Sequence, residues 1–323
     1  MTKIFVGIDL GGTNIKIGCF DAGLNLIGKT SISTHIEQGA EAVVETISLA
    51  VKKLLAEKGI LQKNLCAAGI GSPGIVDIDN GIVVATANLK FYNVPLRQIL
   101  SKRLDRPVIL ENDANVTCWA EYVAGAGKGA DDMVLITLGT GIGGGVISNG
   151  QLIHGWRNAA GEIGHIVTHQ GGQLCGCGQR GCVEAYSSAS ATAMRAKEAI
   201  CAGVRSSLEK VLAEKGEITC KDVYDHSAAG DKLAREITDG TAESLAVLCV
   251  TLLHLTGPKR IIFYGGMISA GNLLLEPIRK FFGEQVWKIQ KEETELCFAT
   301  LGDDAGIIGA AALAINAGQK KKP

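Results

Sequence analysis

A repeated glycine-tipped hairpin is the feature of this sequence that most restricts its fold. Residues 8–13, Ile-Asp-Leu-Gly-Gly-Thr, align with residues 136–141, Ile-Thr-Leu-Gly-Thr-Gly. In both copies an apolar strand-type run leads into the glycines, and a second strand-type run and a polar turn follow. We therefore expect an internally duplicated α/β protein whose two lobes face each other, with the glycine tips in the cleft between them.

The segments around these hairpins predict alternating strands and helices. Apolar spacing predicts a helix over residues 39–58, and further helices are expected from Pro95 and after Asp113. Strand-type runs cover residues 66–70, 82–85, 108–110 and 133–138. We expect the C-terminal third to be helical except for one strand from residue 260, which runs into Gly265-Gly266.

The length of the chain sets the expected number of domains. At roughly 150 residues per domain, 323 residues predict two. We expect an N-terminal lobe of residues 1–114 plus 305–323, and a C-terminal lobe of residues 115–304 that carries a cysteine motif.

The composition favours a globular protein that binds small molecules. Hydrophobic residues make up 46% of the chain, and 32 Lys and Arg against 33 Asp and Glu give a net charge of −1, which argues against nucleic acid as the main partner. The 42 glycines favour close backbone approaches to ligands. Because there is no leader and no apolar run near the ~20 residues that span a bilayer, we expect a cytoplasmic location without membrane contact.

Three glycine patterns match nucleotide-binding motifs in the wrong context. Residues 23–30 match the P-loop pattern, with Lys29 as its lysine, and residues 69–74 and 139–144 match G-x-G-x-x-G. Both motifs require a helix directly after the glycines, whereas strand-type sequence follows here. A P-loop and a dinucleotide-binding fold are therefore disfavoured.

The two hairpin tips are better candidates for holding phosphate. Each offers backbone N–H groups unobstructed by side chains, together with a threonine hydroxyl. The residues concerned are Gly11, Gly12, Thr13, Thr140 and Gly141. In the first copy Asp9 adds a carboxylate for a hydrated Mg²⁺ and Lys16 a cation for phosphate. The alternative interpretation is two ordinary β-turns.

An acidic turn, Glu111-Asn112-Asp113, follows the predicted strand at residues 108–110. The carboxyl ends of strands are where α/β proteins place ligand residues. In a phosphoryl transfer Asp113 would accept the proton of the attacking hydroxyl. The alternative is that Asn112 or Asp113 caps the following helix, and the two roles can fall to different residues.

A cysteine-rich segment predicts a metal site. Cys175, Cys177 and Cys182 lie within eight residues, and three thiolates suit a tetrahedral Zn²⁺ that lacks one ligand. His165 and His169 are the candidates for the fourth position, and a disulfide or redox role is the alternative. Four protein ligands close the site, so the zinc should be structural. Glu162 and Glu184 flank this segment.

In this order and over nearly the whole chain, the motifs resemble the ROK family of bacterial sugar kinases and repressors, within the hexokinase and actin-like ATPase superfamily. The stretches that carry the resemblance are residues 9–16, 71–74, 88–89, 111–113, 138–165, 175–184, 264–266 and 302–309. The resemblance implies a two-lobed α/β fold of the actin-like ATPase (ribonuclease H-like) class.

The resemblance also implies roles for individual residues. It makes Asp113 the catalytic base and His165 the fourth zinc ligand, and it brings Gly265 and Gly266 close to the adenosine of ATP. Sugar-binding positions would be Gly74, Asn88, Asn112, Asp113, Glu162, His165 and Glu184. One departure is Phe91, where many relatives carry Trp, which puts the sugar contact of that loop in doubt.

The implied activity is phosphorylation of a hexose by ATP and Mg²⁺, with glucose as the expected substrate and a homodimer as the expected assembly. Related kinases for N-acetylmannosamine, N-acetylglucosamine, allose or fructose are the alternatives within this class. A sugar-responsive repressor is a second class, but we expect none here because its helix-turn-helix would precede the hairpin that begins at residue 4. A non-catalytic sugar- and zinc-binding protein would require loss of the base or of the phosphate tips, and the sequence has both.

Overall fold

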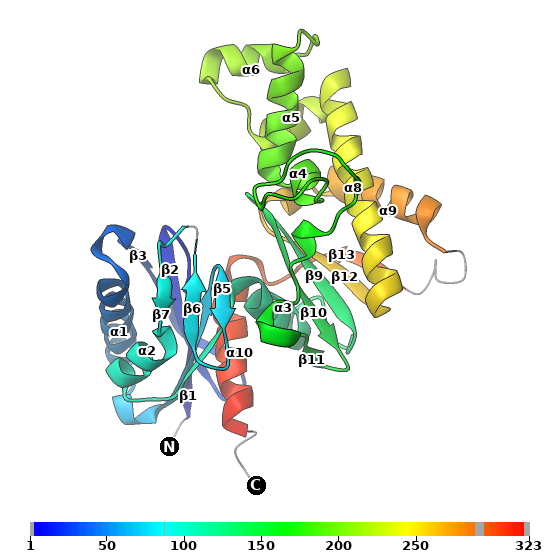
Figure 1. Cartoon of the computed structure of the whole chain (residues 1–323). Helices are drawn as coiled ribbons and strands as arrows, with labels where there is room; N and C mark the ends of the chain where they lie inside the picture. The colour runs from blue at the N-terminus through cyan, green and yellow to red at the C-terminus, as the bar shows by residue number, and fades with distance from the viewer. Residues whose placement is uncertain (1–2, 87, 288–293, 320–323) are drawn as a thin grey trace. The chain divides into compact units, whose positions relative to one another are not determined.

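The computed structural model describes residues 3–86, 88–287 and 294–319, which form two compact units (Figure 1). Unit 1 comprises Met1–Lys128, Leu152–Ala160 and Thr300–Pro323, and unit 2 comprises Gly129–Gln151 and Gly161–Ala299. These ranges differ from the expected ones because residues 115–128, 152–160 and 300–304 fall in unit 1. Helix α3 (Asp113–Ala124) packs on α10 (Ala305–Gln319), which keeps both helices in the same unit.

Unit 1 is built on a five-stranded sheet with the order β3-β2-β1-β4-β8. Its strands are β1 (Ile4–Leu10), β2 (Asn14–Asp21), β3 (Leu26–Ser33), β4 (Leu65–Ser72) and β8 (Val108–Asn112). Strand β1 is antiparallel to β2 and parallel to β4, and β4 is parallel to β8. A second, antiparallel sheet consists of β5 (Ile75–Asp77), β6 (Ile82–Ala85) and β7 (Tyr92–Val94).

The two faces of the larger sheet pack on different helices because side chains alternate along a strand. Val6 and Ile8 of β1 join the core formed with α1 (Ala40–Glu57) and α2 (Leu96–Leu104). On the other face Phe5 packs with Ala314 of α10. Residues 39–58 were expected to be helical, and α1 confirms this with buried apolar residues at helical spacing.

Helix α10 lies directly against the sheet because glycines face it. Gly7 and Gly69 are partners across β1 and β4. A Cβ atom on Gly7 would collide with the carbonyl oxygen of Ile307, and one on Gly69 with that of Ala310. The glycines at these two positions therefore serve backbone packing.

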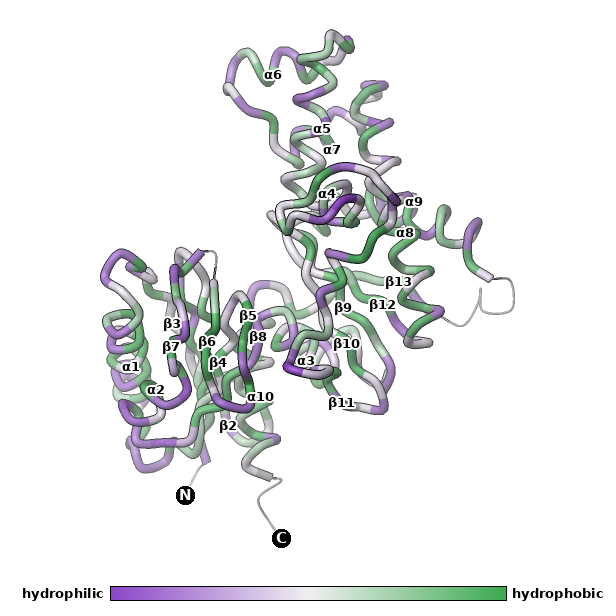
Figure 2. Tube along the Cα trace, in the orientation of Figure 1, coloured by the Kyte–Doolittle hydropathy of each residue, from purple (hydrophilic) through white to green (hydrophobic). Residues whose placement is uncertain are grey.

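Unit 2 repeats the topology of unit 1. Its sheet has the order β11-β10-β9-β12-β13, with β9 antiparallel to β10 and parallel to β12. The strands are β9 (Met133–Leu138), β10 (Ile142–Ser148), β11 (Gln151–Leu152), β12 (Arg260–Tyr264) and β13 (Glu295–Phe298). The expected duplication of the hairpin core is present. In Figure 2 the residues of β4, β9 and β12 are largely hydrophobic, as central strands of such sheets require.

Strand β13 corrects the expectation that the C-terminal third contains a single strand. Its four residues, Glu295–Phe298, pair in parallel with β12 at the edge of the sheet. A four-residue edge strand is too short to show a period in the sequence, so only its pairing with β12 identifies it.

Unit 2 also contains α-helices. They are α4 (Glu184–Ser187), α5 (Ala189–Cys201), α6 (Leu208–Lys215), α7 (Cys220–Ala228), α8 (Lys232–Thr256) and α9 (Asn272–Gln285). Among the described residues, no helix is both long enough and apolar enough to cross a membrane.

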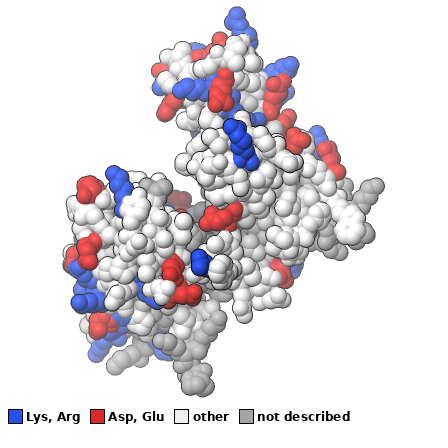
Figure 3. Space-filling view, in the orientation of Figure 1, with Lys and Arg blue, Asp and Glu red and all other residues white. Residues whose placement is uncertain are grey.

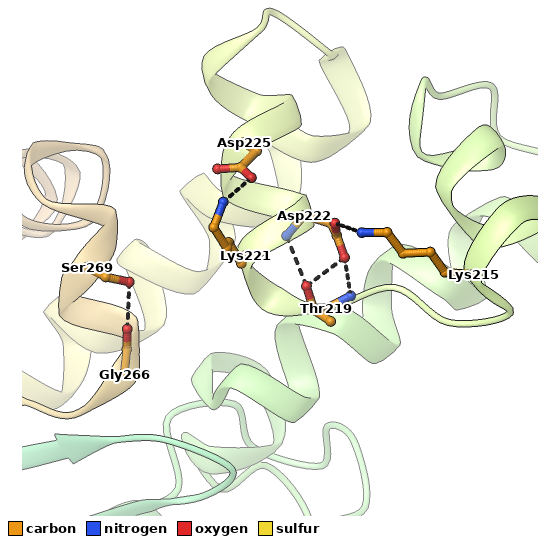
Figure 4. A network of polar contacts seen from close by, with 7 residues as sticks. All are labelled: Lys215, Thr219, Lys221, Asp222, Asp225, Gly266 and Ser269. Atoms are coloured by element: carbon orange, nitrogen blue, oxygen red, sulfur yellow. Dashed lines mark hydrogen bonds and ion pairs between the residues drawn. The ribbon is translucent and has the colours of Figure 1, made fainter.

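A polar network fixes the start of α7 (Figure 4). The Thr219 hydroxyl accepts the Asp222 N–H, and the Asp222 carboxylate accepts the Thr219 N–H in return. Burial raises the pKa of Asp222, but the Lys215 ammonium and Thr219 outweigh it and bring this pKa to about 2. This reciprocal capping gives α7 a defined first residue beside the short helix η5 (Gly266–Ala270).

Candidate functional site

Three parallel strands of unit 1 end at the same edge of the sheet. Asp9 of β1 is paired with Gly71 of β4, which is paired with Glu111 of β8. The first glycine tip, the turn at Gly74 and the Asn112-Asp113 turn follow these three strands directly. The predicted phosphate, sugar and base residues of unit 1 therefore lie along one carboxyl edge, where such sheets bind ligands.

The first glycine tip is held by Thr34, which follows β3. The Thr34 N–H donates to the Thr13 carbonyl oxygen at 2.9 Å, and its hydroxyl donates to the Gly11 carbonyl oxygen at 2.8 Å. Thr34 is buried, whereas Thr13 is exposed at the tip. Sequence reasoning missed this support, because a lone threonine at the end of a strand matches no motif.

Asp9 and Lys16 are directly opposite each other on β1 and β2. Burial raises the pKa of Asp9, and the nearby Lys16 ammonium partly offsets this. The Asp9 carboxylate lies against Gly306 in the first turn of α10, where a Cβ atom would be 2.6 Å from Asp9 Cγ. Lys16 Nζ donates to the Asp303 carbonyl oxygen at 3.1 Å. A carboxylate and an ammonium beside the tip are the groups that a hydrated Mg²⁺ and a phosphate require.

Asn112 is the cap of helix α3. Its Oδ1 accepts the N–H groups of Ala114 at 2.9 Å and Asn115 at 3.2 Å, and its Nδ2 donates to the Gly74 carbonyl oxygen at 3.2 Å. This decides between the two capping candidates and leaves Asp113 as the first residue of the helix, with Oδ1 2.9 Å from the Ala114 nitrogen. The Asn112 amide has a second N–H beyond the bond to Gly74.

The expected sugar loop lies beside the first tip. Asn88 is exposed, and its Cβ lies 3.4 Å from the position that a Cβ on Gly12 would occupy. Two backbone groups of Phe91 close the loop, since its N–H donates to the Thr86 hydroxyl and its carbonyl oxygen accepts the Thr86 N–H. The Phe91 side chain is buried. It anchors the loop in the core. The presence of Phe where many relatives carry Trp therefore does not change an exposed surface.

In unit 2 the second glycine tip is held by Glu184. Glu184 Oε2 accepts the Ile142 N–H at 2.8 Å, and a Cβ atom on Gly141 would lie 2.5 Å from the same oxygen. Thr140 is exposed at the tip. Glu184 Oε1 accepts the S–H of Cys175 at 3.5 Å, so one carboxylate joins the tip to the cysteine segment. Sequence reasoning assigned Glu184 to sugar binding and did not anticipate this contact.

Gly265 and Gly266 follow β12. Gly265 has φ of 105°, and a Cβ atom there would lie 2.5 Å from the Leu138 carbonyl oxygen of β9. Gly266 faces open space, and its carbonyl oxygen accepts the Ser269 hydroxyl at 2.8 Å (Figure 4). Gly265 and Gly266 therefore form a tight turn beside β9, the strand that leads into the second glycine tip. The backbone of this turn is accessible.

Four side chains of unit 2 converge as metal ligands would. The ligand atoms of His165, Cys175, Cys177 and Cys182 all lie within 4.8 Å of one another. Cys177 Sγ is 3.7 Å from Cys182 Sγ, and Cys175 Sγ is 3.7 Å from His165 Nδ1. A tetrahedron with Zn–S bonds of about 2.3 Å and a Zn–N bond of about 2.0 Å has edges of about 3.5–3.8 Å. The donor set and its spacing fit zinc.

His169, the other candidate ligand, lies outside this cluster. Its ring stacks on Tyr186 with 3.9 Å between centroids, and its Nδ1 is 3.0 Å from the Thr168 hydroxyl.

Burial raises the pKa of the Cys175 thiol to about 12, so without a metal this group keeps its proton. Glu162 is exposed immediately before the short helix η4 (Ile163–His165) that carries His165.

The P-loop match at residues 23–30 is accidental, as expected. Lys29 lies within strand β3, and its Nζ is 2.7 Å from Asp304 Oδ2. The two G-x-G-x-x-G matches run into β5 and β10 rather than into helices. None of the three patterns has the helix that its motif requires.

Comparison with known proteins places this geometry in a family. The ROK family profile matches residues 5–317. The glucokinase of Halalkalibacterium halodurans is 36% identical over 306 residues, which cover 94% of this chain and 93% of that protein. A xylose repressor of Caldicellulosiruptor bescii is 27% identical, and the match covers 96% of this chain and 78% of the repressor.

A solved structure supports the same assignment. The crystal structure of a ROK family glucokinase from Streptomyces griseus in complex with glucose and AMPPNP superposes with a TM-score of 0.78 at 34% identity, covering 97% of this chain and 99% of that one. This agreement confirms the expected α/β fold of the actin-like ATPase class. The chain belongs to the ROK family.

Proposed function

We propose that this protein is an ATP-dependent sugar kinase that phosphorylates a hexose hydroxyl, with glucose as substrate and glucose 6-phosphate as product. The observation that supports it best is the shared carboxyl edge in unit 1, where the first glycine tip, the Gly74 turn and Asp113 follow neighbouring strands. The match to glucokinases over nearly the whole chain supports the choice of glucose.

In this proposal Asp113 is the general base. The hydroxyl oxygen of the sugar attacks the terminal phosphorus of ATP, its proton passes to the Asp113 carboxylate, and ADP leaves with the electrons of the broken P–O bond. Gly74, Asn88 and Asn112 bind the sugar in this proposal. The second N–H of the Asn112 amide is the donor for a sugar oxygen.

The glycine tips hold the phosphates in this proposal. Backbone N–H groups of Gly11, Gly12 and Gly141 and the hydroxyls of Thr13 and Thr140 donate to phosphate oxygens, while Lys16 neutralises their charge. Mg²⁺, when bound with the nucleotide beside Asp9, supplies further neutralisation of the transferring group. Gly265 and Gly266 give the adenosine a surface free of side chains.

We further propose that His165, Cys175, Cys177 and Cys182 hold one structural zinc. The donor types and the 3.7 Å spacings support this assignment. Because Nδ1 of His165 faces the cysteines, Nε2 is left to bind a sugar hydroxyl, next to Glu162. Glu184 is a further sugar ligand in this proposal.

Several broader expectations complete the proposal. We expect a cytoplasmic homodimer that binds neither nucleic acid nor membranes. Its net charge of −1 supports the first exclusion, as do the interspersed positive and negative side chains on the face drawn in Figure 3. Kinases for N-acetylmannosamine, N-acetylglucosamine, allose and fructose remain the alternatives for the substrate.

The test is a panel of these hexoses and amino sugars with ATP and Mg²⁺, read as ADP formation. We expect glucose to give the highest kcat/KM. Faster turnover of an N-acetylated sugar would move the assignment to an amino sugar kinase. Sugar binding by calorimetry with no ADP formed from any sugar would contradict a kinase and favour a sugar sensor.

A further inference from the structure

The Glu111 carboxylate organises the turn that carries the proposed base. Its side chain is only 5% exposed. Glu111 Oε1 accepts the Asn112 N–H at 2.9 Å and the Asn115 side-chain amide at 3.0 Å. These two contacts fix the chain on both sides of Asp113. The position of the proposed base therefore depends on how the Glu111 carboxylate is held.

His154 holds the other oxygen of this carboxylate. Its Nε2 lies 2.8 Å from Glu111 Oε2. His154 belongs to residues 152–160, which leave unit 2 after Gln151, pack within unit 1 and return to unit 2 at Gly161. The turn η3 (Trp156–Asn158) in this segment lies beside β5, and Glu162 lies two residues after the end of the segment. The His154–Glu111 contact thus joins the end of β8 to the segment that leads into a proposed sugar ligand.

A buried carboxylate is costly unless its oxygens are satisfied. Asn112 and Asn115 satisfy Oε1, whereas Oε2 has His154 as its partner. Without the imidazole, Oε2 would lose that partner in a buried position. The carboxylate would then turn towards solvent and release the Asn112 N–H, which lies one residue before Asp113.

We propose that His154 and Glu111 form a positioning pair that fixes the Asn112-Asp113 turn and anchors residues 152–160 for sugar phosphorylation. The inference rests on the proposed kinase function and adds two residues to which the sequence motifs assign no role. Neither residue is assigned a contact with substrate. Both act through the groups that they hold in place.

The pair gives the reaction a pH dependence of defined sign. The hydrogen bond to Glu111 raises the pKa of His154 above 6.5, burial opposes this shift, and the charges of Glu111 and Asp79 add to it. Of these two negative charges, Glu111 contacts the imidazole from β8 and Asp79 acts from the β5–β6 turn, while Arg157 of the same segment lies over the Trp156 ring. The ion-pair attraction between protonated His154 and Glu111 is complete below pH 6.5 and is lost as pH rises through the raised pKa of His154, whereas the neutral imidazole keeps a weaker hydrogen bond through an Nε2 proton.

The test compares His154→Leu and His154→Gln with the wild-type enzyme across pH 6–9. We expect His154→Leu to lower kcat by ~10-fold at neutral pH with the KM for ATP within about twofold, because only the turn is displaced. His154→Gln keeps a donor for Glu111 and should recover most of this loss. In both variants the fall of kcat through the raised pKa of His154 should disappear.

A matched control is available in the same unit. His35 Nδ1 lies 3.3 Å from Glu37 Oε1, and both side chains are more than half exposed. His35→Ala should therefore leave kcat and its pH profile unchanged.

The outcomes separate this inference from the proposed function. A wild-type kcat and pH profile in folded His154→Leu would overturn the positioning pair. If that variant does not fold, a wild-type pH profile in His154→Gln would overturn it equally. Asp113→Asn belongs in the same series, because full activity there would defeat the proposed base whatever the His154 variants do.

Discussion

The two glycine-tipped hairpins share a topology and differ in what holds their tips. In unit 1 the β1–β2 tip is fixed by Thr34, a neutral side chain, and lies beside Asp9 and Lys16. In unit 2 the β9–β10 tip is fixed by Glu184, whose second oxygen contacts Cys175 of the cysteine cluster. The two copies therefore share their backbone topology and differ in the side chains that support the tips.

This difference suggests a division of labour between the two copies. The edge beside the first tip carries the proposed base, Asp113, which needs a fixed helix start. The second tip shares Glu184 with residues that fit a zinc site. We therefore expect a change at Asp113 to affect the chemical step and changes in the cysteine cluster to affect sugar binding.

The largest expected effect follows from removing the base. Asp113→Asn keeps the size and most hydrogen bonds of the side chain, so kcat should fall by ~10² or more while sugar affinity changes little. Steady-state kinetics with glucose measure this. Asp105→Asn, at a carboxylate on the same unit that is 97% exposed, is the control and should have no effect. Near-normal turnover of Asp113→Asn would remove Asp113 from the mechanism.

Removal of zinc should affect unit 2, which carries the second hairpin copy and the cysteine cluster. We expect about one zinc per chain by elemental analysis, since four protein ligands make one closed site. Cys177→Ser should lose this zinc and weaken sugar binding by ~10-fold. Zinc fixes the orientation of the His165 ring, and loss of a group that orients such a side chain typically has an effect of about this size. His169→Ala and Cys201→Ser should retain the metal, since neither residue lies in the cluster. Zinc loss in His169→Ala with retention in His165→Ala would reverse the ligand assignment.

Substitutions at the second tip should separate its phosphate role from its link to Glu184. A Cβ atom at Gly139 meets no atom within 4 Å, so Gly139→Val should raise the KM for ATP several-fold and leave sugar binding intact. Gly141→Val should raise the KM for ATP and also disturb sugar binding, because its side chain would displace Glu184. Unchanged ATP kinetics in both variants would mean that the second tip is only a turn.

The smallest effect is expected at the accidental P-loop match. Lys29→Ala removes a half-exposed ion pair with Asp304, which should cost at most about 1 kcal/mol of stability. The kinetic constants for ATP should stay within about twofold, since a β-strand lysine paired with Asp304 is not a P-loop lysine. A collapse of activity in a folded Lys29→Ala variant would contradict this assignment.

Local sequence signals predicted the duplicated core well. Apolar runs that end in glycines specify hairpins, and the helical spacing of residues 39–58 specifies α1, because both patterns involve neighbouring residues. Strand β13 was missed, since its identity depends on pairing with β12 rather than on its own four residues. The extent of unit 1 was underestimated because the packing of α3 on α10 joins residues far apart in the chain.

The site residues also divide into those that local sequence predicted and those that only contacts between distant residues identify. Asn112 and Asp113 are equally good caps by residue type, and only the contacts of Asn112 Oδ1 identify the cap. Thr34 and Glu184 support their tips from distant positions in the sequence, and no motif records such contacts. The two histidines near the cysteines are distinguished by the stacking of His169 on Tyr186.

The most direct test of this division of labour is one equilibrium measurement, the affinity for glucose of Asp113→Asn and Cys177→Ser by isothermal titration calorimetry. The account predicts a Kd for Asp113→Asn within about threefold of the wild-type value, because the loss is confined to the chemical step. It predicts a Kd at least ~10-fold weaker for Cys177→Ser, because loss of zinc frees His165. Wild-type affinity in Cys177→Ser together with lost affinity in Asp113→Asn would contradict it.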